Sequence, residues 1–186
     1  MKILDATTGF KGIWYQKNHP FVTFMDKRKE KLLSNHTTGK RTININPDIV
    51  SEWKDSPFPD NYFDMIIFDP PHLVIKNRDT KPSTLQKSYG VLYEDTWMEE
   101  LRVGINKLFN ILKPNGIFIL KWCENSKRIE EIFKLCPYKP LFGSNTKSKG
   151  HTQNFWVLFI KNKFDGELTN YIQNTQEELH ANNEQS

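Results

Sequence analysis

Short apolar runs separated by polar, turn-forming segments occur along the first 160 residues of the chain. Runs of this length that are rich in β-branched and aromatic residues predict buried strands. The predicted strands are residues 3–4, 21–25, 42–45, 63–68, 117–120 and 155–160. The last of them is expected to pair with a strand near Leu141 and Phe142, across the basic loop 147–151.

Segments with helical spacing alternate with these strands. Residues 94–112 carry apolar side chains three or four positions apart, which predicts a long helix. The sequence Lys-Pro-Asn-Gly at 113–116 is expected to end that helix. Shorter helices are expected at residues 49–53 and 126–135.

Two segments lack periodicity. Residues 74–93 are polar, and a structureless loop of that length inside a compact domain is expected to be functional or disordered. From Asp165 onward the chain is rich in Asn, Gln and Glu, a composition that rarely supports a packed core. We therefore expect one domain, residues 1–164, followed by a polar tail, residues 165–186.

The alternation of strands and helices predicts an α/β fold. The expected architecture is a Rossmann-like doubly wound sheet, mostly parallel, with an antiparallel C-terminal hairpin strand. In such sheets, ligands bind at the carboxyl ends of the strands. The aspartates that come at or just after predicted strand ends are Asp5, Asp26, Asp48 and Asp69. We therefore expect these four side chains to lie along one rim of the sheet.

The most distinctive local sequence is Asp69-Pro70-Pro71-His72, which directly follows the apolar run 65–68. Proline has no N–H and a fixed φ, and it restricts the residue before it, so two prolines predict a stiff, extended turn. This turn would hold a carboxylate and a ring at the open end of the sheet. An amine on a planar base could donate to the first and stack on the second. An Asp-Pro turn can also be purely structural, and the motif alone leaves that alternative open.

Composition changes this picture little. The chain has 186 residues and a net charge of +4, which suits one domain and a nucleic-acid partner without requiring that partner. Its two cysteines have no metal-ligand spacing, so we expect reduced thiols, no metal site and a cytoplasmic location. No apolar run is long enough for a membrane span, and the N-terminus does not resemble a signal peptide.

Three features together resemble the class I S-adenosylmethionine-dependent methyltransferases: the turn Asp5-Ala6-Thr7-Thr8-Gly9-Phe10-Lys11-Gly12, Asp26, and the Asp-Pro-Pro-His motif. More narrowly, the chain is similar to small, phage-like amino-methyltransferases with an Asp-Pro-Pro-aromatic motif, which act on exocyclic amines of nucleobases. The resemblance covers about residues 1–160. It implies S-adenosyl-L-methionine as cofactor and methyl transfer to adenine N6 in DNA. Cytosine N4 in DNA is the next candidate for the methylated atom. The turn has fewer glycines than is usual in that family, and His72 stands where Tyr, Phe or Trp is usual.

The resemblance also implies roles for individual residues. The implied cofactor-binding residues are Asp5, Ala6, Thr7, Gly9, Gly12, Asp26 and Asp48. Among them, Asp26 would accept hydrogen bonds from the ribose hydroxyls, and Asp48 or Asn46 would contact the adenine amine. The implied catalytic residues are Asp69, Pro70, Pro71 and His72. Asp69 and the Pro70 carbonyl would hold the target amine, and His72 would stack on the target base.

Basic residues in two loops would contact the phosphates of a nucleic-acid substrate. These residues are Lys76, Arg78, Lys81, Lys87, Lys147 and Lys149. We expect no separate target-recognition domain. We therefore expect either a relaxed sequence preference or recognition assisted by the second subunit of a homodimer. Two alternatives stay open: methylation of RNA or tRNA bases, and a non-catalytic module that keeps the sheet and the cofactor.

Overall fold

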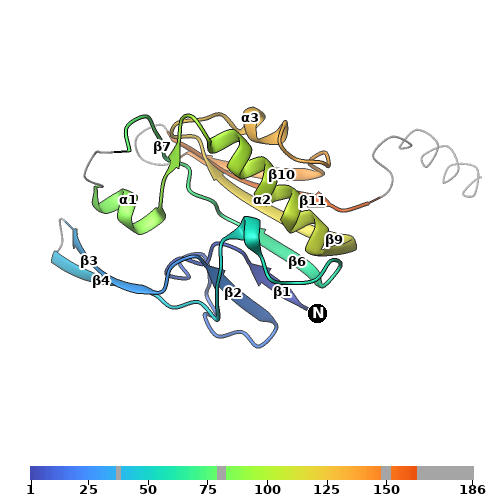
Figure 1. The fold of residues 1–186 in the computed structure, drawn as a ribbon, viewed down its shortest axis with the longest axis horizontal. Helices are drawn as coiled ribbons and strands as arrows, with labels where there is room; N and C mark the ends of the chain where they lie inside the picture. Colours follow the sequence, from blue (N-terminus) through green and yellow to red (C-terminus); the bar gives the residue numbers. More distant parts are fainter. Residues whose placement is uncertain (37–38, 79–82, 148–151, 163–186) are drawn as a thin grey trace, which may run out of the picture.

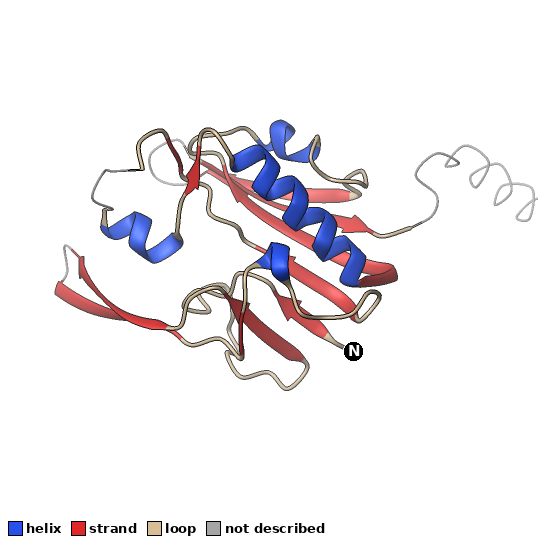
Figure 2. Ribbon diagram, viewed as in Figure 1, coloured by secondary structure: helices blue, strands red, loops and turns tan. Residues whose placement is uncertain are grey.

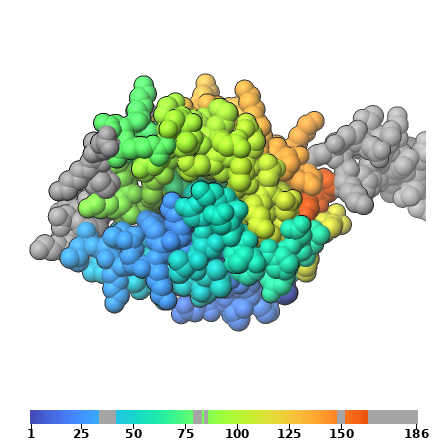
Figure 3. Space-filling view, in the orientation of Figure 1, coloured from blue at the N-terminus to red at the C-terminus, as the bar shows by residue number. Residues whose placement is uncertain are grey.

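The computed structural model describes residues 1–36, 39–78, 83–147 and 152–162. The described residues include a seven-stranded sheet with strands in the order β10-β11-β9-β6-β1-β2-β5 (Figure 1). The expected tail, residues 165–186, lies outside the described residues. In the space-filling view of Figure 3, the first third of the chain, in blue, packs directly against the middle of the chain, in green.

The strands of this sheet are mostly parallel. They are β1 (Ile3–Asp5), β2 (Val22–Asp26), β5 (Ile49–Val50), β6 (Phe63–Phe68), β9 (Leu112–Cys123), β10 (Phe142–Lys147) and β11 (Gln153–Ile160). Parallel pairing joins β5, β2, β1, β6 and β9, whereas β11 is antiparallel to both β9 and β10. The prediction of a mostly parallel, Rossmann-like sheet with an antiparallel C-terminal strand is confirmed.

Helices cover one face of the sheet. The helix α2 (Trp97–Ile111) packs the ring of Phe109 4.5 Å from that of Phe118 on β9. The helix α3 (Ile129–Phe133) places Phe133 6.1 Å from Phe159 on β11, on the same face. The 3-10 helix η1 (Trp53–Asp55) lies against α2, and Figure 2 shows these helices on the same side of the strands. None of the helices in the described ranges has the length and apolar character needed to cross a membrane.

The connection from β1 to β2, the described residues 6–21, contains no helix. Turns join β1 to β2, and Trp14 from these turns packs 5.3 Å from Phe24, on the face opposite to α2. Between β2 and β5, the chain forms a separate antiparallel hairpin of β3 (Glu30–His36) and β4 (Gly39–Ile45).

Two predictions in this region are wrong. Residues 42–45 form part of a strand, but that strand pairs with β3 in the hairpin rather than joining the central sheet. The expected helix at 49–53 is instead strand β5, which pairs with β2, followed by η1. A short apolar run cannot distinguish a strand from a helix by periodicity, so the partner β2 decides. The strand β3 was not predicted because its sequence, Glu-Lys-Leu-Leu-Ser-Asn-His, is mostly polar.

The prediction of a structureless segment at 74–93 is also wrong. Strands β7 (Val74–Ile75) and β8 (Leu92–Tyr93) pair in parallel, with α1 (Thr84–Tyr89) between them. A capping box begins α1: the N–H of Gln86 donates to the Ser83 hydroxyl, and the N–H of Ser83 donates to the Gln86 side chain. The sequence therefore carries a local signal for this helix, a Ser followed three residues later by Gln.

The long helix ends as predicted, at Ile111. The strand β9 begins directly afterwards, at Leu112, earlier than the strand predicted at 117–120. Hydrogen bonds with Lys161 extend the pairing: its carbonyl accepts from Asn115 at 2.7 Å, and its N–H donates to Gly116 at 3.0 Å. The turn signal still has a local effect, because Asn115 has φ +61° and the pairing of β9 with β6 shifts register between Leu112 and Ile117.

Candidate functional site

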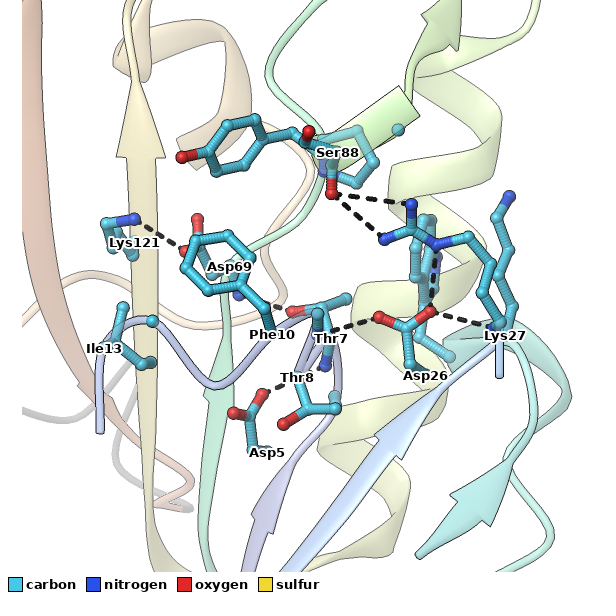
Figure 4. A pocket seen from close by; sticks show the side chains of 18 residues that line it. Asp5, Thr7, Thr8, Phe10, Ile13, Asp26, Lys27, Asp69, Ser88 and Lys121 are labelled. Atoms are coloured by element: carbon cyan, nitrogen blue, oxygen red, sulfur yellow. Dashed lines mark hydrogen bonds and ion pairs between the residues drawn. The ribbon is translucent and has the colours of Figure 1, made fainter. Parts of the chain in front are cut away.

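A cavity opens at the carboxyl ends of β1, β2 and β6 (Figure 4). The cavity and the open solvent at its mouth together have a volume of about 950 Å³. Predicted site residues that line it are Asp5, Ala6, Thr7, Gly9, Gly12, Asp26, Asp69 and Pro71. Within the described residues, no group of three or more side chains suited to metal binding occurs.

Asp5 is the most deeply buried acid of the cavity, with 1% of its surface exposed. Its carboxylate accepts a hydrogen bond from the Trp14 indole N–H at 2.6 Å and one from the Thr7 N–H at 3.2 Å. Burial raises the pKa of Asp5 to about 6, although these hydrogen bonds oppose the shift. Asp5 therefore titrates much closer to neutral pH than an ordinary aspartate.

The turn after β1 exposes its backbone to the cavity. Gly9 has φ +49°, and a side chain built there would meet nothing within 4 Å, so a ligand can approach the main chain closely. Gly12 serves a different purpose, since a Cβ at that position would lie 2.6 Å from the Phe10 ring. The second glycine of the turn thus makes room for Phe10, which lines the cavity.

Asp26, at the end of β2, holds two segments together. One carboxylate oxygen accepts the Gly9 N–H at 2.9 Å, and the other accepts the backbone N–H of Arg28 at 2.9 Å and its Nε at 3.2 Å. Arg28 in turn donates from Nη1 to the carbonyl of Lys87 at 2.8 Å, which ties the end of α1 to the cavity. Arg28 was not predicted as a site residue.

Asp48 does not line the cavity. Its carboxylate accepts the N–H of Phe24 at 2.9 Å, and its own N–H donates to the Phe24 carbonyl at 2.8 Å. Asp48 comes directly before β5, the edge strand next to β2, and does not follow a strand of the central sheet. Its position is therefore away from the carboxyl ends of the strands. The residue that follows β5 and reaches the cavity is Trp53, which was not predicted.

The Asp-Pro-Pro-His sequence begins directly after β6. The N–H of Asp69 donates to the Thr7 hydroxyl at 2.8 Å, and its carboxylate lies 2.6 Å from the Lys121 ammonium. Both prolines are buried, but of the two only Pro71 lines the cavity. Pro71 also packs close to Gly90, where φ is +79° and an added Cβ would lie 3.1 Å from the proline ring.

His72 is half-buried and is not part of the cavity lining. Its ring lies 6.1 Å from that of Tyr89, which lies 6.0 Å from that of Phe10. Burial lowers the pKa of His72, and the neighbouring Lys121 lowers it further while Asp69 opposes the shift. The neutral form of the imidazole is therefore favoured at pH 7.

Lys121 reaches the cavity from β9 and was not predicted either. Its neighbour Trp122 is fully buried on the other face of the strand, where the indole N–H donates to the Lys127 carbonyl at 3.0 Å. Alternation along a strand gives this outcome, because a core tryptophan directs the preceding side chain to the opposite face. That alternation was the available sequence signal.

The residues predicted to contact nucleic acid are spread over several segments. Lys76, Lys87 and Lys147 are exposed. Nη2 of Arg78 donates to both carboxylate oxygens of Asp95, at 2.8 and 2.9 Å. The Arg78 guanidinium also lies 4.0 Å from the Tyr93 ring centre. The other two predicted residues, Lys81 and Lys149, lie outside the described residues.

No family model and no curated protein matches this sequence. Solved structures with a similar fold include the Burkholderia thailandensis 1,6-didemethyltoxoflavin-N1-methyltransferase with bound S-adenosylhomocysteine. That likeness has a TM-score of 0.50 at 12% identity and covers 87% of this chain and 71% of that one. A SAM-dependent methyltransferase from Methanosarcina mazei has a TM-score of 0.50 at 10% identity, over 87% of this chain and 92% of that one.

A similar fold also occurs in the [4+2]-cyclase SpnF, with a TM-score of 0.52 at 10% identity, over 87% of this chain and 75% of that one. At these identities the likeness is one of fold. The chain has the fold of the class I S-adenosylmethionine-dependent methyltransferases. Because a cyclase has a similar fold, the fold alone does not determine the reaction, and the residues of the cavity have to specify it.

Proposed function

We propose that this protein is an S-adenosylmethionine-dependent methyltransferase that acts on an exocyclic amine of a nucleobase, with adenine N6 in DNA as the first candidate. The observation that carries the proposal is that Asp69, the acid of the Asp-Pro-Pro-His sequence, lines the same cavity as Asp5 and Asp26. Asp69, which the resemblance assigns to the acceptor amine, thus shares one cavity with most of the residues that it assigns to the cofactor.

The cavity residues fit S-adenosylmethionine chemically. The Asp26 carboxylate has four lone-pair sites and receives three hydrogen bonds from Gly9 and Arg28, so it can still accept from a ribose hydroxyl. The open space at Gly9 allows a ligand to approach the backbone. Asp5, which has no cationic partner among its hydrogen bonds to Trp14 and Thr7, adds negative charge above its pKa of about 6, which suits a positively charged sulfonium. The bound cofactor would supply an activated methyl group on that sulfur.

Asp69 would position the acceptor amine. Lys121 contacts one of its carboxylate oxygens, Oδ2, and no hydrogen bond from the described part of the chain reaches the other, which can accept an incoming N–H. A hydrogen bond from the amine to this oxygen would orient the nitrogen lone pair and balance the positive charge that develops on nitrogen during transfer. The neutral ring of His72 would stack on the base. A base in duplex DNA would have to be flipped out of the helix to reach the cavity.

The resemblance and the exposed cations Lys76, Lys87 and Lys147 favour a base that is part of a nucleic acid. Phosphate contacts from such residues would favour nucleic acid over a free nucleoside. DNA is preferred because the Asp-Pro-Pro-aromatic motif resembles that of the DNA amino-methyltransferases. A homodimer would supply further contacts for recognising the target.

The direct test is incorporation of labelled methyl from S-adenosylmethionine into unmethylated DNA and, in parallel, bulk RNA. Digestion and mass identification of the modified nucleoside then name the base. We expect N6-methyladenine in DNA; N4-methylcytosine would keep the reaction and change the base. Label confined to RNA would favour the RNA alternative. A protein that binds the cofactor and labels neither polymer would be the non-catalytic module.

A further inference from the structure

Lys121 and Asp69 form a close ion pair inside the cavity. The Lys121 ammonium lies 2.6 Å from Asp69 Oδ2, and the two side chains are 24% and 23% exposed (Figure 4). Both come from the carboxyl-end side of adjacent parallel strands, since Phe68 of β6 is paired with Leu120 of β9. The ammonium also lies 5.8 Å from the ring centre of Trp156 on β11, which limits its freedom to move away.

This pair presents two different hydrogen-bonding groups next to each other. An ammonium has three N–H donors, and Asp69 engages one of them. The second carboxylate oxygen of Asp69 is an acceptor. A ligand that approaches from the cavity therefore meets an acceptor beside a donor. The complementary molecular edge has an N–H donor beside an acceptor atom.

The Watson–Crick edges of adenine and cytosine have this pattern. In adenine, the N6 amine lies beside the unprotonated ring nitrogen N1, and in cytosine the N4 amine lies beside N3. On the Watson–Crick edge of guanine, the ring nitrogen N1 next to the N2 amine carries a hydrogen, so on that edge a donor would face the Lys121 ammonium. Two facing donors leave buried polar groups unpaired, which strongly disfavours the wrong base.

We infer that Lys121 is a specificity-determining residue, which donates a hydrogen bond to the ring nitrogen beside the target amine while Asp69 accepts one from the amine itself. This inference rests on the proposed function, and it favours the Watson–Crick edge of adenine or cytosine at that site over the Watson–Crick edge of guanine. A hydrogen bond to the ring nitrogen withdraws electron density from the amine, so it does not make the amine a better nucleophile. Lys121 therefore acts on binding and selection, so its loss raises KM more than it lowers kcat.

Base analogues that lack the ring acceptor test this assignment without requiring turnover. Single-stranded oligonucleotides of mixed sequence carry adenine or 1-deazaadenine, and a second pair carries cytosine or 3-deazacytosine. Their binding to the full chain with S-adenosylhomocysteine is measured by fluorescence anisotropy. For one of the two pairs, the wild-type protein should bind the natural base about 10- to 100-fold more tightly, the effect of one hydrogen bond from a charged donor.

The Lys121→Met variant should bind the natural and deaza bases of that pair with equal affinity. Lys113 provides a matched control, because it pairs with Asp64 at 2.7 Å on the same two strands, β9 and β6, at the opposite end of the sheet. Lys113→Met should discriminate as the wild type does. Equal binding of natural and deaza bases by the wild type, or discrimination that survives in Lys121→Met, would overturn the assignment.

Methyl transfer measured on the same oligonucleotides separates this inference from the proposed function. Discrimination in binding without any methyl transfer would remove the proposed reaction and leave the role of Lys121 in place. Methyl transfer that proceeds equally on natural and deaza bases would overturn the role of Lys121 and leave the reaction in place. If none of the oligonucleotides binds, both are overturned.

Discussion

The hydroxyl of Thr7 accepts a hydrogen bond from the backbone N–H of Asp69, at a distance of 2.8 Å. The two residues are 62 positions apart in sequence and belong to the turns that follow β1 and β6. The prolines at 70 and 71 have no N–H, so Asp69 is the last backbone donor before this stiff turn. One side chain thus sets the position of the Asp-Pro-Pro-His sequence relative to the proposed cofactor-binding turn.

Thr7→Val should separate the two turns. The Asp69 N–H would lose its partner, which costs about 1–3 kcal/mol for a buried group. We expect a lower free energy of unfolding in urea and a fall in kcat that exceeds the change in cofactor Kd. Thr7→Ser keeps the hydroxyl and is the matched control, so a serine variant as impaired as the valine variant would contradict this explanation.

Asp69→Asn should suppress methyl transfer by about 100-fold or more, because the amide is neutral and no longer balances charge on the acceptor nitrogen. Cofactor binding, measured by calorimetry, should change only a few-fold, since the cofactor residues are on β1 and β2. Asp64, on β6, pairs with Lys113 as Asp69 pairs with Lys121. Asp64→Asn should keep full activity, and an Asp69→Asn variant that does the same would exclude the proposed role.

The acid limb of activity should depend on His72. Burial holds the pKa of His72 below its ordinary value of 6.5, so the ring gains a proton and a charge only as the pH falls below that value. A charged imidazole stacks less well on a base, and kcat/KM should fall there. In His72→Phe the part of this limb that belongs to the imidazole should disappear, and the part that belongs to Asp5, whose pKa is about 6, should remain, as measured from pH 5 to 8. An unchanged profile in the phenylalanine variant would assign the limb to another group.

Asp5 should make the protein less stable as the pH rises. Its pKa is about 6 in the folded state against 3.8 in the unfolded chain, so between these values the folded state binds the extra proton. Stability is therefore lost from about pH 4 through pH 6, by a total on the order of 3 kcal/mol above that range. Asp5→Asn removes this dependence.

The measurement is the difference in urea unfolding free energy between Asp5→Asn and the wild type at several pH values. The variant should gain stability relative to the wild type as the pH rises from 4.5 to 7.5. Groups other than Asp5 cancel in this difference. A difference that does not change with pH would show that Asp5 titrates at its ordinary value.

Arg28→Met should loosen α1 without unfolding the sheet. Arg28 joins Asp26 to the carbonyl of Lys87, and loss of hydrogen bonds from a charged donor costs about 1.5–3 kcal/mol. Amide hydrogen exchange of residues 84–89 should become about tenfold faster or more. Arg102, whose ion pair with Glu99 is exposed, gives the control Arg102→Met, which should leave exchange in α1 unchanged.

Much of the cavity could be predicted from sequence because its acids follow distinct strands. Asp5, Asp26 and Asp69 each end or follow an apolar run that is a strand of the central sheet, and parallel strands bring such ends together. The same reasoning misplaced Asp48. The chain forms the β3–β4 hairpin after β2, so the strand that pairs with β2 is Ile49–Val50. That run is too short to show a period.

The residues that were missed depend on contacts between distant segments. Arg28 matters because α1 ends beside β2, and nothing in the local sequence indicates that proximity. Tyr89 lies beside Phe10 for the same reason. Lys121 is different, because the burial of Trp122 by alternation would have indicated the face on which the lysine lies.

The contact between Pro71 and Gly90 has a consequence for anyone who wishes to graft the Asp-Pro-Pro-His sequence onto another protein. The motif brings with it a neighbour that must have no side chain, since position 90 combines φ +79° with a Cβ position 3.1 Å from the proline ring. A transplant of the four residues alone would meet whichever side chain the recipient carries at that point. A transferable unit therefore has to include Gly90 and the paired strands β7 and β8, which bring the chain near Gly90 back toward the motif.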